Sequence, residues 1–130
     1  MAGYRTDLAR ARGLGSAKHG VGTWIAERVS AAALVPLVLW AVFSALMLSV
    51  ASYEAAVVWL RSPLNAVLLT LLIGVGFWHM HAGLRVVIED YVESGLLRVG
   101  LLLGNLFICV LFGALAAFSI LKVAVGGGAF

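Results

Sequence analysis

Two histidines and an Asp-Tyr pair lie close together in the most informative stretch of the sequence. His79 and His81 fall within an apolar segment, and Asp90 and Tyr91 follow at its end. Ionisable side chains at membrane depth are costly and mark functional sites. Neutral imidazole is an ordinary axial ligand of haem iron. A tyrosine hydroxyl can donate a hydrogen bond to a quinone carbonyl, and an aspartate can pass protons inward from water. The stretch therefore indicates a haem ligand near a quinone pocket.

The helical period places His79 on one stripe with the residues that could serve a haem. Measured from His79, Gly83 is rotated by about 40° and Asp90 by about 20°. Gly83 lies one turn away and removes side-chain bulk where a flat macrocycle could press. Asp90 lies roughly 16 Å further along the axis. This puts Asp90 and Tyr91 at the rim of the membrane and His79 nearer its interior.

His81 points about 200° away from His79, so one helix cannot aim both side chains at one iron. Arg85 and Glu89 follow His81 at intervals of one turn. This second stripe is typical of side chains that reach from the membrane toward the headgroups. The role of His81 stays open.

Each candidate also has a purely structural explanation. A membrane histidine such as His79 can simply hydrogen-bond a neighbouring helix. Acids and tyrosines are common at span ends, which applies to Asp90 and Tyr91. Arg28 could neutralise a haem propionate, or it could only reach the lipid headgroups. The joint pattern, more than any single residue, favours the haem and quinone hypothesis.

The elements that position these residues are membrane spans. The chain has 130 residues, of which 63% are hydrophobic. Three stretches without charge each exceed the roughly 20 residues that cross a bilayer as a helix. The sequence therefore predicts an all-α integral membrane protein with three transmembrane helices. The expected helices cover residues 24–50, 63–88 and 97–122, with charge-free stretches at 29–53, 62–84 and 99–121.

The expected anchor domain covers residues 24–123, between an N-terminal tail at 1–23 and a flexible C-terminal tail at 124–130. The first tail is broken by glycines; its arginines faintly suggest a transit peptide, although an amphipathic helix is lacking. Residues 51–62 are expected to form an outer loop. Three spans make a thin bundle that cannot enclose a large cofactor well by itself. This predicts a partner subunit.

Most cationic residues lie before the first span or beside the connection between the second and third spans. The positive-inside rule then places the N-terminus in the cytoplasm and the C-terminus in the periplasm. The cations suit anionic lipid headgroups and give no sign of nucleic-acid binding. The residues concerned are Arg5, Arg10, Arg12, Lys18, Arg28, Arg85 and Arg98.

Three further features follow from single residues. Cys109 is the one cysteine, so the chain can form no internal disulfide, and it is expected to pack as an apolar side chain. Pro36 predicts a modest kink within the first span. Ser62 and Pro63 are expected to be the N-cap and the first residue of the second helix.

The motif His79-x3-Gly83-x6-Asp90-Tyr91-Val92 resembles the small cytochrome b membrane anchor of succinate dehydrogenase, respiratory complex II. The Arg28-x-Ser30-Ala31 start of the first span, the segment at residues 15–20 and the three-span layout are also similar. The resemblance covers nearly the whole chain, and the spacing from histidine to Asp-Tyr is its most specific part. It implies a multi-pass protein of the bacterial inner membrane.

The resemblance also implies the roles of the site residues and the partners. His79 would ligate the iron of haem b, with the second ligand from the larger cytochrome b anchor of the complex. Arg28 would pair with a haem propionate. Tyr91 would hydrogen-bond ubiquinone, with Asp90 beside it for proton delivery. An iron–sulfur protein and a flavoprotein would oxidise succinate, so this chain would be one part of a succinate:quinone oxidoreductase.

Two alternatives remain at this point. The chain could anchor a fumarate reductase, which runs the chemistry in reverse. It could also be a small transporter or channel component, with His79 and His81 in a proton path. Against the second alternative, none of the charge-free stretches contains Asp or Glu. His81 departs from the simplest pattern of the anchor family and leaves the choice of haem ligand open.

Overall fold

The computed structural model describes residues 6–13 and 20–126, and every described element is helical. Three of the helices, α2, α4 and α5, are long and apolar enough to cross a membrane. The predicted all-α fold with three spans is therefore confirmed. The helices are α1 (Asp7–Ala11), α2 (Val21–Leu48), α3 (Tyr53–Arg61), α4 (Pro63–Tyr91) and α5 (Gly95–Val125).

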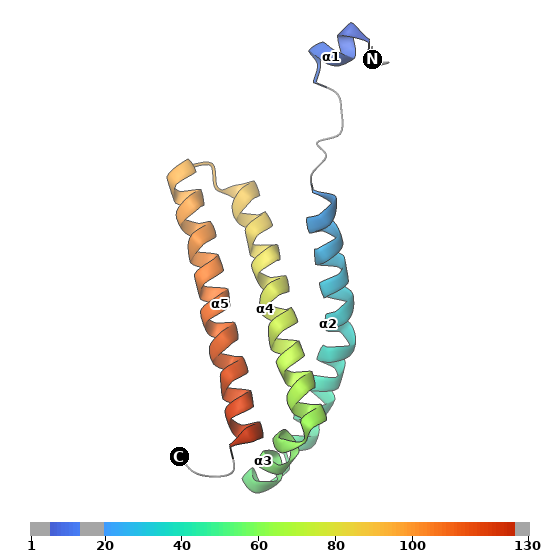
Figure 1. Cartoon of the computed structure of the whole chain (residues 1–130), viewed down its shortest axis with the longest axis vertical. Helices are drawn as coiled ribbons and strands as arrows, with labels where there is room; N and C mark the ends of the chain where they lie inside the picture. The colour runs from blue at the N-terminus through green and yellow to red at the C-terminus, as the bar shows by residue number, and fades with distance from the viewer. Residues whose placement is uncertain (1–5, 14–19, 127–130) are drawn as a thin grey trace.

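Helix α4 lies between α2 and α5 and makes the main span-to-span contacts with both (Figure 1). The short helix α3 packs against α4 and α5 at the end of the layer opposite the α4–α5 connection. Many large apolar side chains on the spans face outward, among them Phe43, Trp78 and Phe107. Exposed apolar surface on this scale needs lipid or protein to cover it, so the three helices form an anchor rather than a self-contained core.

Polar residues are prominent among the few buried positions. Ser30 and Ser44 of α2 and Asn105 of α5 are buried, beside the small residues Ala66 and Cys109. Small and hydroxylated side chains let membrane helices approach closely and hydrogen-bond one another. The interfaces of α4 with its neighbours are therefore stabilised by close packing of small side chains and by specific hydrogen bonds.

The observed spans extend beyond several predicted limits. Helix α2 begins at Val21 rather than at residue 24, after Gly20, whose φ of 104° only glycine adopts readily. It continues through Pro36 and curves along its length (Figure 1). Helix α4 begins at Pro63, as expected, and runs to Tyr91, so Asp90 and Tyr91 belong to its last turn. Hydropathy marks the apolar part of a helix and misses the turns that continue into the interface.

The sequence predicted an outer loop at residues 51–62. This prediction was wrong in part, because Tyr53–Arg61 forms helix α3. The Ser52 hydroxyl accepts a hydrogen bond from the amide of Ala55 and caps this helix. The Trp59 ring stacks on Trp40 of α2 with 5.7 Å between the ring centroids. Hydrogen bonds from its own backbone amide and from Ser52 hold the pKa of Glu54 below its usual value.

The expected N-terminal tail contains one short helix, α1, capped by the Thr6 hydroxyl. At the other end, α5 continues through Val125 into what was expected to be tail. The predictions for residues 1–5, 14–19 and 127–130 lie outside the described residues. The division into tail, anchor domain and tail stays a prediction.

Candidate functional site

His79 lies where α4 packs on α2. Its Nδ1 atom is 2.9 Å from the hydroxyl oxygen of Ser30, which is a buried residue of α2. The same Ser30 hydroxyl donates a hydrogen bond of 3.0 Å to the carbonyl oxygen of Glu27. One helix turn of α2 thus supplies the partner that orients the imidazole.

The surroundings of His79 are otherwise apolar. The side chain borders an open groove of about 400 Å³, whose other lining residues are aliphatic. These residues are Ala31, Leu34, Val35, Val38 and Leu39. Within the described part of the chain, the second ring nitrogen, Nε2, makes no hydrogen bond, so it is available to a ligand.

These residues fit one side of a haem site. A b-type haem needs an imidazole and apolar surface for the macrocycle, and His79 with its groove offers both. The groove is open, so another chain would have to supply the opposite wall. No group of three or more His, Cys, Asp and Glu side chains in the described residues could chelate a metal ion.

His81 lies on the opposite side of α4, where that helix packs on α5. The Asn105 side-chain nitrogen is 3.1 Å from His81 Nδ1 and 3.0 Å from the His81 carbonyl oxygen. Cys109 donates a hydrogen bond of 3.3 Å to the Asn105 side-chain oxygen. The prediction that the two histidines face different directions is confirmed, since each contacts a different neighbouring helix.

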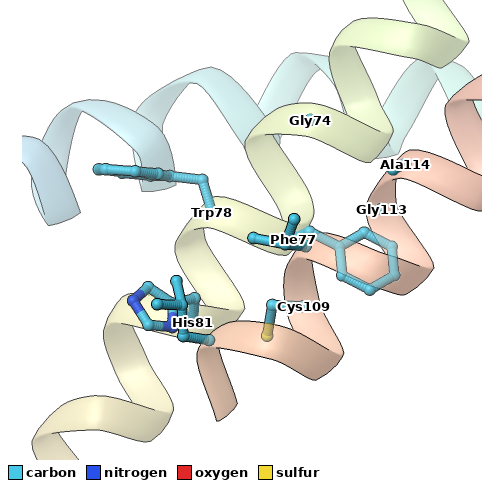
Figure 2. Close-up of a pocket in the computed structure, with 9 residues that line it drawn as sticks. Gly74, Phe77, Trp78, His81, Cys109, Gly113 and Ala114 are labelled. Atoms are coloured by element: carbon cyan, nitrogen blue, oxygen red, sulfur yellow. The ribbon is translucent and has the colours of Figure 1, made fainter. Parts of the chain in front are cut away.

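A slot of about 250 Å³ runs beside this network between α4 and α5. Figure 2 shows that His81 and Phe77 come from α4, whereas Cys109 and Gly113 come from α5. Cys109 is buried, as expected of a packing residue, but it also takes part in a hydrogen bond. Asn105 was not predicted from the sequence, although a single amide in an apolar span was a usable signal.

The remaining site residues lie near one end of the spans. Asp90 and Tyr91 occupy the last turn of α4, and 83% of Tyr91 is exposed. Arg28 is exposed on α2, and its guanidinium lies 5.6 Å from the centre of the Trp24 ring. No described hydrogen bond or ion pair joins these three residues to His79. The structure therefore brings His79 together with Ser30, and leaves the other three open to water, lipid or partners.

The second predicted stripe of α4 forms an ion pair. Arg85 Nε lies 2.7 Å from Glu89 Oε1, one helix turn away. Both residues border a groove of about 360 Å³ between α2 and α4, which His81 and Glu27 also line. The pair is about half exposed, so it satisfies two charges at the end of the span and adds little stability.

Fold and site together define a multi-pass membrane anchor with a histidine site between its helices. Residues 2–121 match the succinate dehydrogenase/fumarate reductase transmembrane subunit family. Similar curated proteins from Rickettsia bellii, Rickettsia conorii and Paracoccus denitrificans are each named succinate dehydrogenase hydrophobic membrane anchor subunit. No solved structure matches the chain significantly.

The relatives are bacterial and similar over most of their length. The Paracoccus denitrificans protein is 33% identical over 107 residues, which cover 80% of this chain and 81% of the relative. The Rickettsia bellii protein is 30% identical over 95 residues, covering 73% and 76%. The Rickettsia conorii protein is 29% identical over 108 residues, covering 82% and 86%.

The chain therefore belongs to the succinate dehydrogenase/fumarate reductase transmembrane subunits, among the succinate dehydrogenase membrane anchors. This confirms the resemblance to succinate dehydrogenase anchors that was based on the motif containing His79, Asp90 and Tyr91. Three apolar helices and bacterial relatives make it a multi-pass protein of the inner membrane.

Proposed function

We propose that this chain binds haem b jointly with a second membrane anchor and forms part of the ubiquinone site of a succinate dehydrogenase complex. The observation that carries the proposal is the His79 imidazole, held by Ser30 at the edge of an open apolar groove. Asp90 and Tyr91 end the same helix. Family membership supports the complex, and the geometry of α4 supports the site.

His79 would hold the haem iron through its imidazole. Haem b, when bound there, would supply a one-electron redox centre. The aliphatic side chains beside His79 would exclude water from one face of the macrocycle, which helps set its potential. Arg28 is a permanently charged residue of α2, two positions before Ser30, so it could neutralise a propionate.

Tyr91 and Asp90 would act on the quinone. The Tyr91 hydroxyl would donate a hydrogen bond to a quinone carbonyl, which favours the added negative charge during reduction. Asp90 is exposed and adjacent, so it would exchange protons with water and deliver them to the reduced quinone. Both residues project from the end of α4, where a partner chain can complete the pocket.

The partners follow from the missing parts of the reaction. The larger cytochrome b anchor would supply the second haem ligand and the other wall of the groove. An iron–sulfur protein would deliver electrons, and a flavoprotein would oxidise succinate. The cation distribution favours a cytoplasmic position for the N-terminus and for the end with Asp90 and Tyr91, beside those soluble partners.

The two alternatives now differ in support. The family includes fumarate reductase subunits, but the relatives described above are named for succinate dehydrogenase, which favours the oxidising direction. Family membership argues against a transporter. The described membrane histidines also pair with Ser30 and Asn105 on different sides of α4, so they form no single proton path.

A reduced-minus-oxidised visible spectrum of the chain purified with its partners from native membranes tests the proposal. We expect a b-type α band that appears when succinate is added as the only reductant. Such a band would show haem, partner and electron transfer together. A colourless preparation that retains the flavin and iron–sulfur partners would overturn haem binding and leave only the anchoring role.

A further inference from the structure

We infer that the neighbouring helices set the two membrane histidines in opposite tautomers, so that Ser30 is a positioning residue for His79. Ser30 of α2 holds His79 with its proton on Nδ1. Asn105 of α5 holds His81 with its proton on Nε2. The inference rests on the proposed haem ligation by His79 and deepens it, because it explains why His79 rather than His81 would bind iron.

The tautomer of His79 follows from the single proton of the Ser30 hydroxyl. That proton is directed to the carbonyl oxygen of Glu27, 3.0 Å away, which can only accept. Toward His79 Nδ1, at 2.9 Å, the Ser30 oxygen can then only accept a hydrogen bond. The imidazole must therefore donate from Nδ1, and Nε2 keeps its lone pair for a ligand. Ser30 is only 7% exposed, so little water competes for this hydrogen bond.

The tautomer of His81 follows from the Asn105 amide. The backbone carbonyl of His81 can only accept, so the Asn105 atom 3.0 Å from it must be the NH₂ group. The hydrogen bond from Cys109 to the other amide atom agrees with this orientation. The second proton of the NH₂ group then points to His81 Nδ1, 3.1 Å away, which must accept. His81 carries its own proton on Nε2 and presents a donor where a metal needs a lone pair.

The hydrogen bond from His79 also bears on the redox potential of the site. A ligating histidine that donates its second N–H becomes a more basic ligand, and such partners tune the metal. A more basic ligand stabilises oxidised iron over reduced iron. Loss of the Ser30 oxygen should therefore raise the midpoint potential of the haem and loosen its binding.

The test uses the whole complex with three variants of α2. Ser30→Ala should weaken haem retention about 10–100-fold, the range typical of lost outer-shell partners. It should also move the haem midpoint potential to a more positive value. Ser30→Thr keeps the hydroxyl and should restore both properties. Ser44→Ala is the matched control, because Ser44 lies on the same helix and is also 7% exposed.

The outcomes separate this inference from the proposed function. If His79→Ala removes the haem while Ser30→Ala behaves like Ser44→Ala, the positioning role is overturned and ligation stands. If His79→Ala leaves the haem in place, the proposed ligation itself fails. If Ser30→Ala loses haem and Ser30→Thr fails to restore it, Ser30 acts through packing and the positioning role is again overturned.

A second measurement reads the tautomers directly. Nitrogen NMR of histidine-labelled complex distinguishes protonated from unprotonated ring nitrogens, and His81→Ala identifies the signals of His81. We expect an unprotonated Nδ1 and a protonated Nε2 for His81, with this preference lost in Asn105→Ala. A protonated Nδ1 on His81 in the unmodified complex would overturn the assignment.

Discussion

The Ser30 hydroxyl and the His79 imidazole meet across the interface of α2 and α4, with 2.9 Å between Oγ and Nδ1. The two residues are 49 positions apart in the chain. On the far side of α4, His81 pairs with Asn105 of α5, with 3.1 Å between His81 Nδ1 and the Asn105 side-chain nitrogen. The central span therefore uses one histidine toward each neighbour. His79 borders an open groove lined by aliphatic side chains, whereas His81 lines the slot beside Phe77 and Cys109 and the groove that Arg85 and Glu89 border.

Replacement of the two histidines should have unequal effects on haem. We expect His79→Ala to abolish or strongly reduce the haem content of the purified complex, because it removes the proposed ligand of the haem iron. His81→Ala should retain most of the haem, since it removes only a partner of Asn105. Haem per flavin, read from the visible spectrum, measures the difference.

Both histidine variants should be checked for assembly through the flavin and iron–sulfur content of the membranes. Equal assembly with unequal haem supports the ranking. The reverse ranking, with haem lost only in His81→Ala, would show that the ligand had been assigned to the wrong histidine.

Removal of the Tyr91 hydroxyl should separate the two half-reactions of the complex. We expect Tyr91→Phe to lower succinate:quinone activity by roughly tenfold or more, because the hydroxyl would donate to the quinone during reduction. Succinate oxidation with an artificial soluble acceptor should stay unchanged, since it does not use the membrane site. Steady-state rates with the two acceptors measure the ratio.

Tyr53→Phe is the matched control for Tyr91→Phe. Tyr53 begins α3 near the opposite end of the spans and is 80% exposed, close to the 83% of Tyr91. It should leave both activities unchanged. If Tyr91→Phe lowers both activities together, Tyr91 contributes to assembly rather than to quinone chemistry.

The fold was predictable from the sequence to the extent that hydropathy decides it. Each span contains a charge-free run longer than the bilayer requires, and a helix satisfies its backbone hydrogen bonds within one segment in lipid. Helix α3 was missed because Tyr53, Trp59 and Arg61 were interpreted as a loop at the interface. The Ser52 cap was the available signal, but stacking of Trp59 on Trp40 depends on the tertiary structure.

The site was only half predictable. The helical period correctly separated His79 from His81, because spacing within one helix fixes direction. It could not identify Ser30 or Asn105 as their partners, since that depends on which faces of three helices meet. Ser30 was noted only as part of the Arg28-x-Ser30-Ala31 pattern. Buried hydrogen bonds between spans are thus the information that the structure adds.

Loss of Asn105 should destabilise the anchor without removing haem. Asn105→Ala leaves His81 Nδ1 without its donor and Cys109 without its acceptor, in a buried interface. Interhelical hydrogen bonds in membranes contribute about 0.6 kcal/mol on average and up to about 1.7. We expect a loss near the upper value, measured as a lower thermal midpoint of the detergent-solubilised complex.

Ser119→Ala is the control for Asn105→Ala. Ser119 lies on the same helix, but its exposed hydroxyl donates only to the carbonyl of Leu115 within α5. Its loss should change the midpoint little. A complex in which both variants melt alike would mean that the Asn105 network adds nothing to the packing of α4 on α5.

A larger side chain at Gly113 should force α4 and α5 apart. A Cβ atom at Gly113 would lie only 3.3 Å from the Phe77 ring, which Figure 2 shows lying over α5 at this residue. The β-branched chain in Gly113→Val would extend further into that contact. Overpacking of this kind destabilises by about 1–3 kcal/mol. In Gly104→Val, on the same helix, the new Cβ would meet nothing within 4 Å. We therefore expect Gly113→Val to lower the thermal midpoint of the complex and Gly104→Val to leave it nearly unchanged; equal midpoints would show that the Phe77 contact yields without strain.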